Sequence, residues 1–356
     1  MKVAFTHPYS WPEVRRGAER IVVESARALA ARGHDVTILT AGSTPQRSHQ
    51  DGVTSVKLRR LFDSPARHEA WFAARIVPYL IVNRFDVIHS MMPRDAVSAI
   101  WTRRLGLARH RTLYDEMGNP WKWYWADLPD RRARERVVQS VDVYGCMSRY
   151  SLGVLEKEWH RTGVLIPGGV SLSGFAIAPE RAAQPTILFS GAFAEPRKGL
   201  SVLLEAIALL ADEQPGVRLW LSGSGDATPF LDAAPEAART RTDVLPLGTP
   251  GEQGQRYGQA WVTTLPSVDD SFGVALIESL ACGTPIVVAD HAAPPELVTP
   301  ETGAICQPKD PVSLAQALRQ GLALAGKPET AQRCRSFAAA FDWDQGLAPL
   351  LEQLYA

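Results

Sequence analysis

Short apolar runs alternate with longer amphipathic segments along this chain. The run "KVAFTHPY" near the start is typical of a strand, and "GAERIVVESARALAARG" follows it, with Ile21, Val22 and Leu29 at helical spacing and Gly33 as a stop signal. The run "HDVTILTAG" is the next predicted strand, so the chain begins β-α-β. Further predicted strands, with a helix over "RDAVSAIWTRRLG", extend the series to about residue 170: "FDVIHS", "RTLYDE", "VDVYGCMS" and "GVLIPGGV".

A second series of the same kind begins at "PTILFSGAF". It continues with a helix over "GLSVLLEAIALLADE" and a strand in "VRLWLSGSGD" that ends in a glycine turn. The runs "DVLPLG", "WVTTLP" and "PIVVAD" are further predicted strands, with a helix over 271–281 between the last two. Because strands that alternate with helices are typical of parallel sheets, we predict an α/β protein with two open, parallel-sheet domains.

The boundary between the two series lies in 167–185, "PGGVSLSGFAIAPERAAQP", which is rich in Pro, Gly and Ala and has little periodicity. A chain of 356 residues is long for a single core and suits two domains. We therefore place the first domain at residues 1–170 and the start of the second at residue 171.

Charge is distributed unevenly, although 38 cationic and 38 acidic side chains balance over the whole chain. Residues 1–170 carry 26 Lys and Arg against 17 Asp and Glu, and residues 171–356 carry 12 against 21, so the halves have formal charges of +9 and −9. A basic half can face an anionic substrate, a membrane surface or nucleic acid. A solvated Arg-rich surface that faces the acidic half fits the same counts. Nucleic-acid binding has no supporting motif, so we do not expect it.

The cysteines and the first residues bear on cellular location. Cys146, Cys282, Cys306 and Cys334 are far apart and form no CxxC pair, which argues against a zinc site and a disulfide framework and fits a reducing cytosol. The start "MKVAFTHPYS" lacks the apolar region of a signal peptide, and no apolar run approaches the ~20 residues of a membrane-spanning helix. We expect a cytoplasmic protein.

Two glycine-containing and cationic segments precede predicted helices. Open α/β sheets bind ligands beyond the carboxyl ends of their strands, where helix N-termini point free N–H groups at anions. In "WPEVRRGAER", Gly17 would let a ligand approach the backbone, although an ordinary strand-to-helix turn fits too, and the chain has no GxGxxG motif. In "GAFAEPRKGL", Arg197 and Lys198 could clamp a diphosphate, whereas a solvated basic loop fits the same residues.

Two acidic residues eight positions apart flank the otherwise apolar start of "DSFGVALIESLACGTPIVV". Asp270 lies in the loop after "WVTTLP", Ser271 can cap the following helix, and Gly273 leaves backbone amides accessible to a ligand oxygen. Glu278, two turns along the helix, can reach back toward the same edge. Carboxylates accept hydrogen bonds from vicinal hydroxyls, so the pair suits a ligand with two polyol portions. A capping acid with an exposed helical Glu is the alternative.

A fourth segment, "YDEMGNPWKWYWADLP", combines acids with aromatic residues at a strand end. Asp115 and Glu116 end the predicted strand, and Trp121 and Trp123 follow in the loop. Such aromatics could stack on sugar rings, lie at a membrane interface or pack under a long loop. His89, at the end of "FDVIHS", is a further candidate for the site, although it could serve only to cap its strand.

Together these segments resemble glycosyltransferase family four, the retaining GT-B enzymes that use nucleotide-sugar donors. The resemblance implies a GT-B fold of two Rossmann-like domains that face across a cleft. It implies an acceptor-side domain at residues 1–170, a nucleotide-sugar domain at 171–336 and a C-terminal helix in 337–356 that packs back on the first domain. The likeness spans nearly the whole chain and is carried by "RRGAERIVVESARALAARGHDVTILT", "LIPGGV", "EPRKGLSVLLEAI", "LSGSGD", "PSVDDSFGVALIESLACGTPIVVAD" with "PELV", and "FDWDQGLAPLLEQLY".

The resemblance also implies roles for individual residues. In the family, an acid-x7-acid motif holds the donor, so Asp270 would contact the sugar hydroxyls and Glu278 the ribose. Backbone groups would contact the remaining parts of the donor. These are Ser271, Phe272 and Gly273 at the sugar and phosphate, Gly17 at the diphosphate and Thr249 at the base.

Two positions of the donor site depart from the family pattern. The first acid of the motif is usually Glu, and Asp270 is one methylene shorter. The diphosphate is usually held by an Arg after the strand glycine together with a Lys. Ala192 stands at the Arg position and Lys198 is present, so we suggest that Arg197 supplies the missing charge.

The implied reaction moves a sugar to an acceptor hydroxyl with retention of the anomeric configuration, and a nucleoside diphosphate leaves. Lys198 and Arg197 would stabilise the charge that grows on the leaving group. The strand that in the family often ends in a His near the reacting sugar ends here in Asp115 and Glu116, which with Asp270 could orient the reactants. We expect no metal ion or other cofactor, because protein cations take that role and the nucleotide sugar is a co-substrate.

The acceptor is the least determined part of this interpretation. A lipid, a saccharide or another small molecule would fit, and His89, Trp121 and Trp123 are the predicted acceptor-side residues. The basic half could place the protein at the inner face of a membrane. Two alternatives stay open: a GT-B nucleotide-sugar epimerase and a catalytically weakened nucleotide-sugar-binding protein. Consumption of donor only in the presence of acceptor would distinguish a transferase from both.

Overall fold

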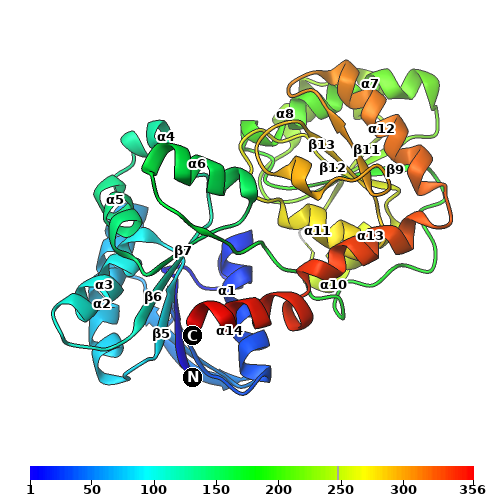
Figure 1. Cartoon of the computed structure of the whole chain (residues 1–356). Helices are drawn as coiled ribbons and strands as arrows, with labels where there is room; N and C mark the ends of the chain where they lie inside the picture. The colour runs from blue at the N-terminus through cyan, green and yellow to red at the C-terminus, as the bar shows by residue number, and fades with distance from the viewer. Residues whose placement is uncertain (247) are drawn as a thin grey trace. The chain divides into compact units, whose positions relative to one another are not determined.

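The computed structural model describes residues 1–246 and 248–356. The chain forms two compact units (Figure 1). The N-terminal unit contains Met1–Gly169 together with Trp343–Ala356, and the C-terminal unit contains Val170–Asp342. The sequence places the start of the tail at residue 337, whereas in the structure the tail of the N-terminal unit starts at Trp343.

The described residues of the N-terminal unit form a sheet of eight strands in the order β3-β4-β2-β1-β5-β6-β7-β8. All neighbouring strands run parallel except β3, which pairs antiparallel with β4 at one edge. The strands are β1 (Lys2–Thr6), β2 (Asp35–Gly42), β3 (Gln46–Gln50), β4 (Val53–Arg59), β5 (Val87–Ser90), β6 (Arg111–Glu116), β7 (Val143–Cys146) and β8 (Val164–Leu165).

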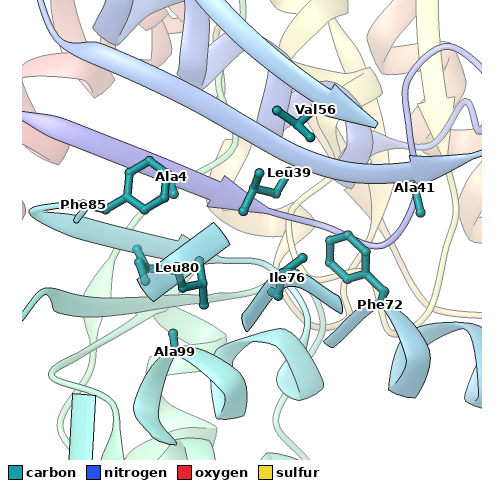
Figure 2. Packing of buried hydrophobic residues seen from close by; sticks show 10 residues of the cluster. Ala4, Leu39, Ala41, Val56, Phe72, Ile76, Leu80, Phe85 and Ala99 are labelled. Atoms are coloured by element: carbon teal, nitrogen blue, oxygen red, sulfur yellow. The ribbon is translucent and has the colours of Figure 1, made fainter. Parts of the chain in front are cut away.

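Helices cover both faces of this sheet, as parallel strands require. The apolar side chains of α2 and α3 pack on one face, where Phe72, Ile76 and Leu80 of α2 meet Leu39 and Val56 of the sheet (Figure 2). On the other face, α1 lies beside the C-terminal helix α14 (Figure 1). The helices of this unit are α1 (Gly17–Ala31), α2 (Pro65–Val82), α3 (Pro93–Arg104), α4 (Lys122–Ala126), α5 (Arg131–Ser140), α6 (Arg149–Trp159), the π-helical turn η4 (Trp343–Leu347) and α14 (Ala348–Tyr355).

The hairpin β3–β4 and the helix α2 are not predicted by the hydrophobic pattern. Every residue of β3, "QRSHQ", is exposed and polar, so this strand has no apolar alternation to detect. The signal that marks the hairpin is its two-residue turn, Asp51-Gly52, with φ angles of 52° and 75°. Asp-Gly at positive φ in both positions is typical of the type I′ turn that joins twisted antiparallel strands.

The C-terminal unit contains, in its described residues, a parallel sheet of six strands in the order β11-β10-β9-β12-β13-β14. Ile187, Leu188 and Phe189 of the central strand are fully buried, because helices cover both faces. The strands are β9 (Thr186–Ser190), β10 (Arg218–Ser222), β11 (Thr242–Leu245), β12 (Val262–Leu265), β13 (Ile286–Ala289) and β14 (Gly303–Cys306). The prediction of two open α/β domains with parallel sheets is confirmed.

The helices of the C-terminal unit alternate with these strands. Most follow a strand directly, as expected for right-handed βαβ crossovers. They are η1 (Pro196–Lys198), α7 (Leu200–Glu213), α8 (Thr228–Asp232), α9 (Glu236–Arg239), α10 (Pro250–Gln259), α11 (Val274–Ala281), η2 (Pro294–Leu297), α12 (Pro311–Ala325), α13 (Thr330–Ala338) and η3 (Ala339–Phe341).

Candidate active site

The strand order of the C-terminal unit changes direction at β9. The chain passes from β9 to β10 and β11 on one side and then returns to place β12 on the other side of β9. Open α/β sheets bind ligands at such switch points, beyond the carboxyl ends of the strands. Arg197 and Lys198 lie in the loop after β9, and Asp270 lies in the loop after β12. The fold thus brings these three predicted residues together.

Asp270 contacts both cations. Lys198 Nζ lies 2.7 Å from Asp270 Oδ1 and 3.0 Å from Oδ2, and Arg197 Nη1 lies 2.7 Å from Oδ1. Asp270 is only 7% exposed. Burial acts to raise the pKa of Asp270, but the charges of Lys198 and Arg197 outweigh it and hold this pKa below its ordinary value. The carboxylate is therefore ionised at neutral pH and keeps two cations at the switch point.

Close packing of the two loops maintains this arrangement. Gly199 has a φ of 74°, and a Cβ atom there would lie 2.4 Å from the carbonyl oxygen of Pro266 in the loop after β12. The backbone N–H of Val268 donates to the carbonyl oxygen of Arg197 at 2.8 Å. Only glycine at position 199 lets η1 come close enough for Arg197 and Lys198 to reach Asp270.

Glu278 lies on α11 and is 4% exposed. Its carboxylate interacts with Tyr257 of α10, and burial, followed by the charge of Glu278, raises the pKa of this tyrosine well above its ordinary value. The Tyr257 hydroxyl donates to Ser190 Oγ at 3.0 Å, and Ser190 is the last residue of β9. Glu278 is thereby linked to the strand whose following loop carries Lys198.

The polar network around Tyr257 was not predicted. Gln253 Nε2 donates to Ser190 Oγ at 3.2 Å, and Ser222 Oγ donates to Gln253 Oε1 at 2.6 Å. Arg256 Nη1 donates to Ser222 Oγ at 2.9 Å. Ser190 and Ser222 each end an apolar strand, "TILFS" and "RLWLS". A polar residue at the end of an apolar run is the sequence signal that could have indicated them.

The residues between the two acids lie at the N-terminus of α11. Gly273 is the N-cap with a φ of 101°, and no side chain caps the helix there. Phe272 is buried and packs on Phe341, with the ring centroids 5.7 Å apart, so its side chain belongs to the interior. Contacts of the donor with the backbone of Ser271, Phe272 and Gly273 stay predictions.

Thr249 is the N-cap of α10. Its hydroxyl accepts from the backbone N–H of Glu252, and its own N–H donates to Glu252 Oε2 at 2.6 Å, which is a capping box. The N–H of Thr249 is thus engaged by its own helix. A contact between the backbone here and a nucleobase stays a prediction.

The contacts of Arg197 are relevant to position 192, where alanine stands in place of the arginine that is usual in the family. The second guanidinium nitrogen, Nη2, lies 2.6 Å from Glu195 Oε2, and the side chain is 41% exposed. Its Nη1 shares Asp270 Oδ1 with the Lys198 ammonium group. Two positive charges therefore stand side by side although position 192 is alanine.

In the N-terminal unit, the strand order reverses between β1 and β5, and Gly17 opens α1 after the loop that leaves β1. The Thr6 hydroxyl lies 2.9 Å from Ser90 Oγ and 2.5 Å from Asp95 Oδ2, which ties the ends of the two strands together. Gly17 is exposed, and no side chain caps α1. Its predicted contact with a diphosphate stays a prediction.

His89 and Asp115 lie inside the N-terminal unit rather than on an open surface. Both are almost fully buried, at 1% and 2% exposure, because α14 covers them. His89 Nδ1 lies 2.8 Å from the Tyr355 hydroxyl, and Nε2 lies 4.0 Å from Asp115 Oδ2. Burial lowers the pKa of His89 to about 3, whereas burial and then the charge of Glu116 raise the pKa of Asp115 well above its ordinary value. Both side chains are thus enclosed among the described residues of this unit, and the acceptor contact of His89 and the catalytic role of Asp115 stay predictions.

Glu116 is likewise engaged within the core. Its carboxylate accepts from the hydroxyls of Tyr114 at 3.0 Å and Tyr144 at 3.1 Å and from the backbone N–H of Gly118 at 3.0 Å. Arg134 Nη1 lies 3.4 Å away. These partners engage both oxygens and link β6 to β7, and the role of Glu116 in orienting reactants stays a prediction.

The predicted aromatic residues do form a partly open surface. Trp121 and Trp123 stack with ring centroids 5.5 Å apart and an interplanar angle of 26°, and Trp123 is 64% exposed. Trp125, two residues further, is buried against Trp159. The loop is thus partly core and partly surface, and a contact of Trp121 and Trp123 with an acceptor stays a prediction.

Two further findings concern residues 1–246 and 248–356. This part of the chain contains no group of three or more His, Cys, Asp and Glu side chains arranged to hold a metal ion. It also contains no helix whose length and apolar character would let it cross a bilayer.

Comparison with protein families assigns each unit to a glycosyltransferase domain. The model described as "Glycosyltransferase Family 4" matches residues 15–173, and the model described as "Glycosyl transferases group 1" matches residues 184–323. The first match ends three residues past the boundary between the units at Val170, and the second begins within the C-terminal unit. The second includes the cations at 197 and 198 and both acids, Asp270 and Glu278.

Individual proteins agree with this assignment. The chain is 27% identical to a phosphatidyl-myo-inositol mannosyltransferase of Mycobacterium leprae over 89% of this chain and 86% of the relative. It is 26% identical to a GDP-mannose-dependent alpha-(1-6)-phosphatidylinositol dimannoside mannosyltransferase of Mycobacterium tuberculosis over 96% and 93% of the two chains. A sucrose-phosphate synthase from Thermosynechococcus elongatus shares the fold with a TM-score of 0.84 at 21% identity, over 99% of this chain and 98% of that one. The chain therefore combines a Glycosyltransferase Family 4 domain with a Glycosyl transferases group 1 domain and has the GT-B fold.

Proposed function

We propose that this enzyme transfers a sugar from a nucleoside-diphosphate donor to an acceptor hydroxyl with retention of the anomeric configuration and without a metal ion. The observation that carries the proposal is the buried, ionised Asp270 with Lys198 and Arg197 at the switch point of the C-terminal unit. The site offers two positive charges for a leaving diphosphate and a carboxylate for sugar hydroxyls. Glu278 would accept hydrogen bonds from the ribose.

The bond changes follow from this arrangement. The bond between the anomeric carbon and the diphosphate oxygen breaks, and a bond from the same carbon to the acceptor oxygen forms on the same face. The acceptor proton passes to the leaving diphosphate. Negative charge grows on the diphosphate in the transition state, and fixed cations such as Lys198 and Arg197 lower the barrier because they need no reorganisation. This use of protein cations supports a reaction without metal.

GDP-mannose is the donor to test first. One relative is named as GDP-mannose-dependent, and both relatives are named as mannosyltransferases. Their names also point to phosphatidylinositol-based acceptors, so a glycolipid or saccharide acceptor is proposed here. The cation excess of residues 1–170 supports contact with an anionic membrane at the inner face, and sedimentation with phosphatidylglycerol vesicles but not phosphatidylcholine vesicles would test that part.

The test of the proposed reaction has two stages. A thermal-shift screen of nucleoside diphosphates and their sugars, with EDTA present, identifies the donor. Proton NMR of the product formed from that donor and a mannose-containing acceptor then reports the anomeric configuration. Retention with full activity in EDTA supports the proposal, whereas inversion or a requirement for added metal contradicts it. Consumption of donor without acceptor would instead indicate an epimerase.

A further inference from the structure

The N-terminal unit contains a groove that the site described above does not use. It has a volume of about 400 Å³ and lies between α1 and the β3–β4 hairpin. One end is formed by the loop after β1, including Tyr9 and Trp11, and the other by Arg27 and Asp51. Its α1 wall runs from Glu19 to Arg27, which at 1.5 Å per residue is about 12 Å. The groove is long enough for two sugar rings.

The hairpin presents a regular set of hydrogen-bonding side chains to this groove. Gln46, Ser48 and Gln50 alternate along β3 and therefore share one face of the strand. In the antiparallel register, Ser48 lies opposite Ser55 and Gln46 opposite Lys57, and both partners also line the groove. Two amides and two hydroxyls thus face the same space, each able to donate and to accept.

The charged side chains of the groove cancel in pairs. Lys57 Nζ lies 2.7 Å from Glu13 Oε1, Arg27 Nε lies 3.3 Å from Asp51 Oδ2, and Glu19 accepts from Arg16. Each charge that lines the groove therefore has an opposite partner. A ligand that carries a net charge would meet no uncompensated counter-charge here, so the chemistry favours a neutral ligand.

The opposite face of the same hairpin has contrasting chemistry. A second groove of about 680 Å³ lies there, lined by Arg47, Arg59 and Arg75 together with Trp71, and its described lining residues include no Asp or Glu. Gln46 and Lys57 line both grooves, whereas Ser48 and Gln50 line only the first and Arg47 only the second. The charge-balanced lining of the first groove therefore does not extend to the second.

We infer that the groove between α1 and the β3–β4 hairpin is a saccharide-binding site, which holds a neutral disaccharide segment. Amide and hydroxyl side chains match the vicinal hydroxyls of sugars, and Trp11 supplies an aromatic ring at the end near the loop after β1. This inference rests on the proposed function in one respect, since it makes the acceptor a saccharide chain whose units beyond the reacting sugar lie along α1.

The test measures disaccharide binding without catalysis. Saturation-transfer NMR with mannobiose, maltose and cellobiose, and with inorganic phosphate as an anionic probe, is carried out on the full chain. The Ser48→Arg variant places a long arginine side chain in the groove. Because β3 is exposed, this substitution should not disturb the core. His49→Arg places the same side chain on the opposite face of β3, where His49 Nδ1 lies 3.1 Å from Thr54 Oγ1. We expect at least one disaccharide to bind, with affinity reduced about tenfold or more in Ser48→Arg and unchanged in His49→Arg.

Three outcomes would overturn the inference: no disaccharide binds the wild type, Ser48→Arg binds as well as the wild type, or only phosphate binds. A Gln46→Ala/Gln50→Ala variant, which adds no bulk, must weaken the same disaccharide. The affinity for GDP, measured by thermal shift, should be the same in the wild type and in all variants. If neither GDP nor any other nucleoside diphosphate binds the wild type, the proposed function is rejected. Disaccharide binding in the groove would still decide the inference made here.

Discussion

In each unit a buried carboxylate lies near the end of a strand, and the pKa values of these two carboxylates are shifted in opposite directions. Asp270 follows β12 and is held by Lys198 and Arg197, which lower its pKa despite 7% exposure. Asp115 is the last but one residue of β6 and is 2% exposed, its Oδ2 lies 4.0 Å from His89 Nε2, and burial raises its pKa. One of its oxygens, Oδ1, has no hydrogen-bond partner among the described residues.

The difference shows that the position of an acid at a strand end does not define its role. Burial alone favours the neutral form, and two adjacent cations reverse that preference. The cations that hold Asp270 ionised are those that the proposed function assigns to the diphosphate. Asp115, with His89 and Tyr355, lies where the tail contacts the N-terminal sheet.

The substitution with the largest expected effect removes a cation beside Asp270. Lys198→Ala should lower turnover about 100-fold or more, because it removes one fixed charge from the leaving group. Steady-state kinetics with saturating donor measures this. Lys327→Ala, an exposed lysine in the same unit, is the matched control and should keep wild-type turnover. Near-normal turnover of Lys198→Ala would contradict the proposed role of the cations beside Asp270.

Next in size is the effect of the second acid. Glu278→Gln should weaken nucleoside-diphosphate binding about tenfold, since a charge-assisted hydrogen bond to the ribose becomes a neutral one. Calorimetric titration with GDP measures the affinity. Glu205→Gln, at an exposed position of α7, should bind GDP as the wild type does. Equal affinities in all three proteins would mean that Glu278 serves only its contact with Tyr257.

Asp115→Asn tests the buried carboxylate of the N-terminal unit. The pKa of Asp115 is raised in the folded state, so the stability cost of this residue is absent below its ordinary pKa of 3.8 and grows as pH rises toward neutrality. An asparagine removes that cost, and we expect the melting temperature of the N-terminal unit to rise by about 2–4 °C at pH 7 with turnover unchanged.

The control for Asp115→Asn is Asp142→Asn. Asp142 accepts hydrogen bonds from Thr112 and pairs with Arg103, and although burial opposes it, these partners lower its pKa. Its removal should therefore lower the melting temperature at pH 7. A loss of turnover in Asp115→Asn without a loss of stability would show that Asp115 takes part in catalysis.

The smallest expected effect concerns a third carboxylate, on the tail. Hydrogen bonds from Arg32 at 2.7 Å and His34 at 2.8 Å lower the pKa of Glu352 to about 2. The stabilisation is present above the ordinary value of 4.5 and is lost as pH falls toward 2. Because the pair is solvent-accessible, Glu352→Gln should cost less than about 1 kcal/mol in urea unfolding at pH 7, and less still in high salt. A larger cost would mean that solvent screens this pair less than its exposure implies.

The sequence predicted the donor-side cluster because its signals are local. Asp270, Lys198 and Arg197 lie in loops after apolar strands, and strand order alone brings the loops together. The burial of His89 and Asp115 could not be predicted in the same way. Their burial depends on α14, which arrives from the other end of the chain to place Tyr355 on His89, and no local pattern encodes that contact.

The groove and the polar network were missed for a related reason. β3 lacks apolar residues, so its alternation of Gln46, Ser48 and Gln50 is visible only once the Asp51-Gly52 turn sets the register. The network joins Gln253 and Tyr257 of α10 to Ser190 of β9 and Ser222 of β10, three elements that are far apart in the sequence. Only the serines at the strand ends could have indicated it.

In the proposed function, Arg197 and Lys198, held by Asp270, bind the diphosphate of the donor. This role is tested most directly by calorimetric comparison of GDP with guanosine, or of the matching pair for the donor that the screen identifies, in the wild type and in an Arg197→Gln/Lys198→Gln variant. We expect the wild type to bind the diphosphate about tenfold or more tightly than the nucleoside, and the variant to bind both ligands with nearly equal, weak affinity. A variant that keeps the wild-type preference for the diphosphate would contradict it.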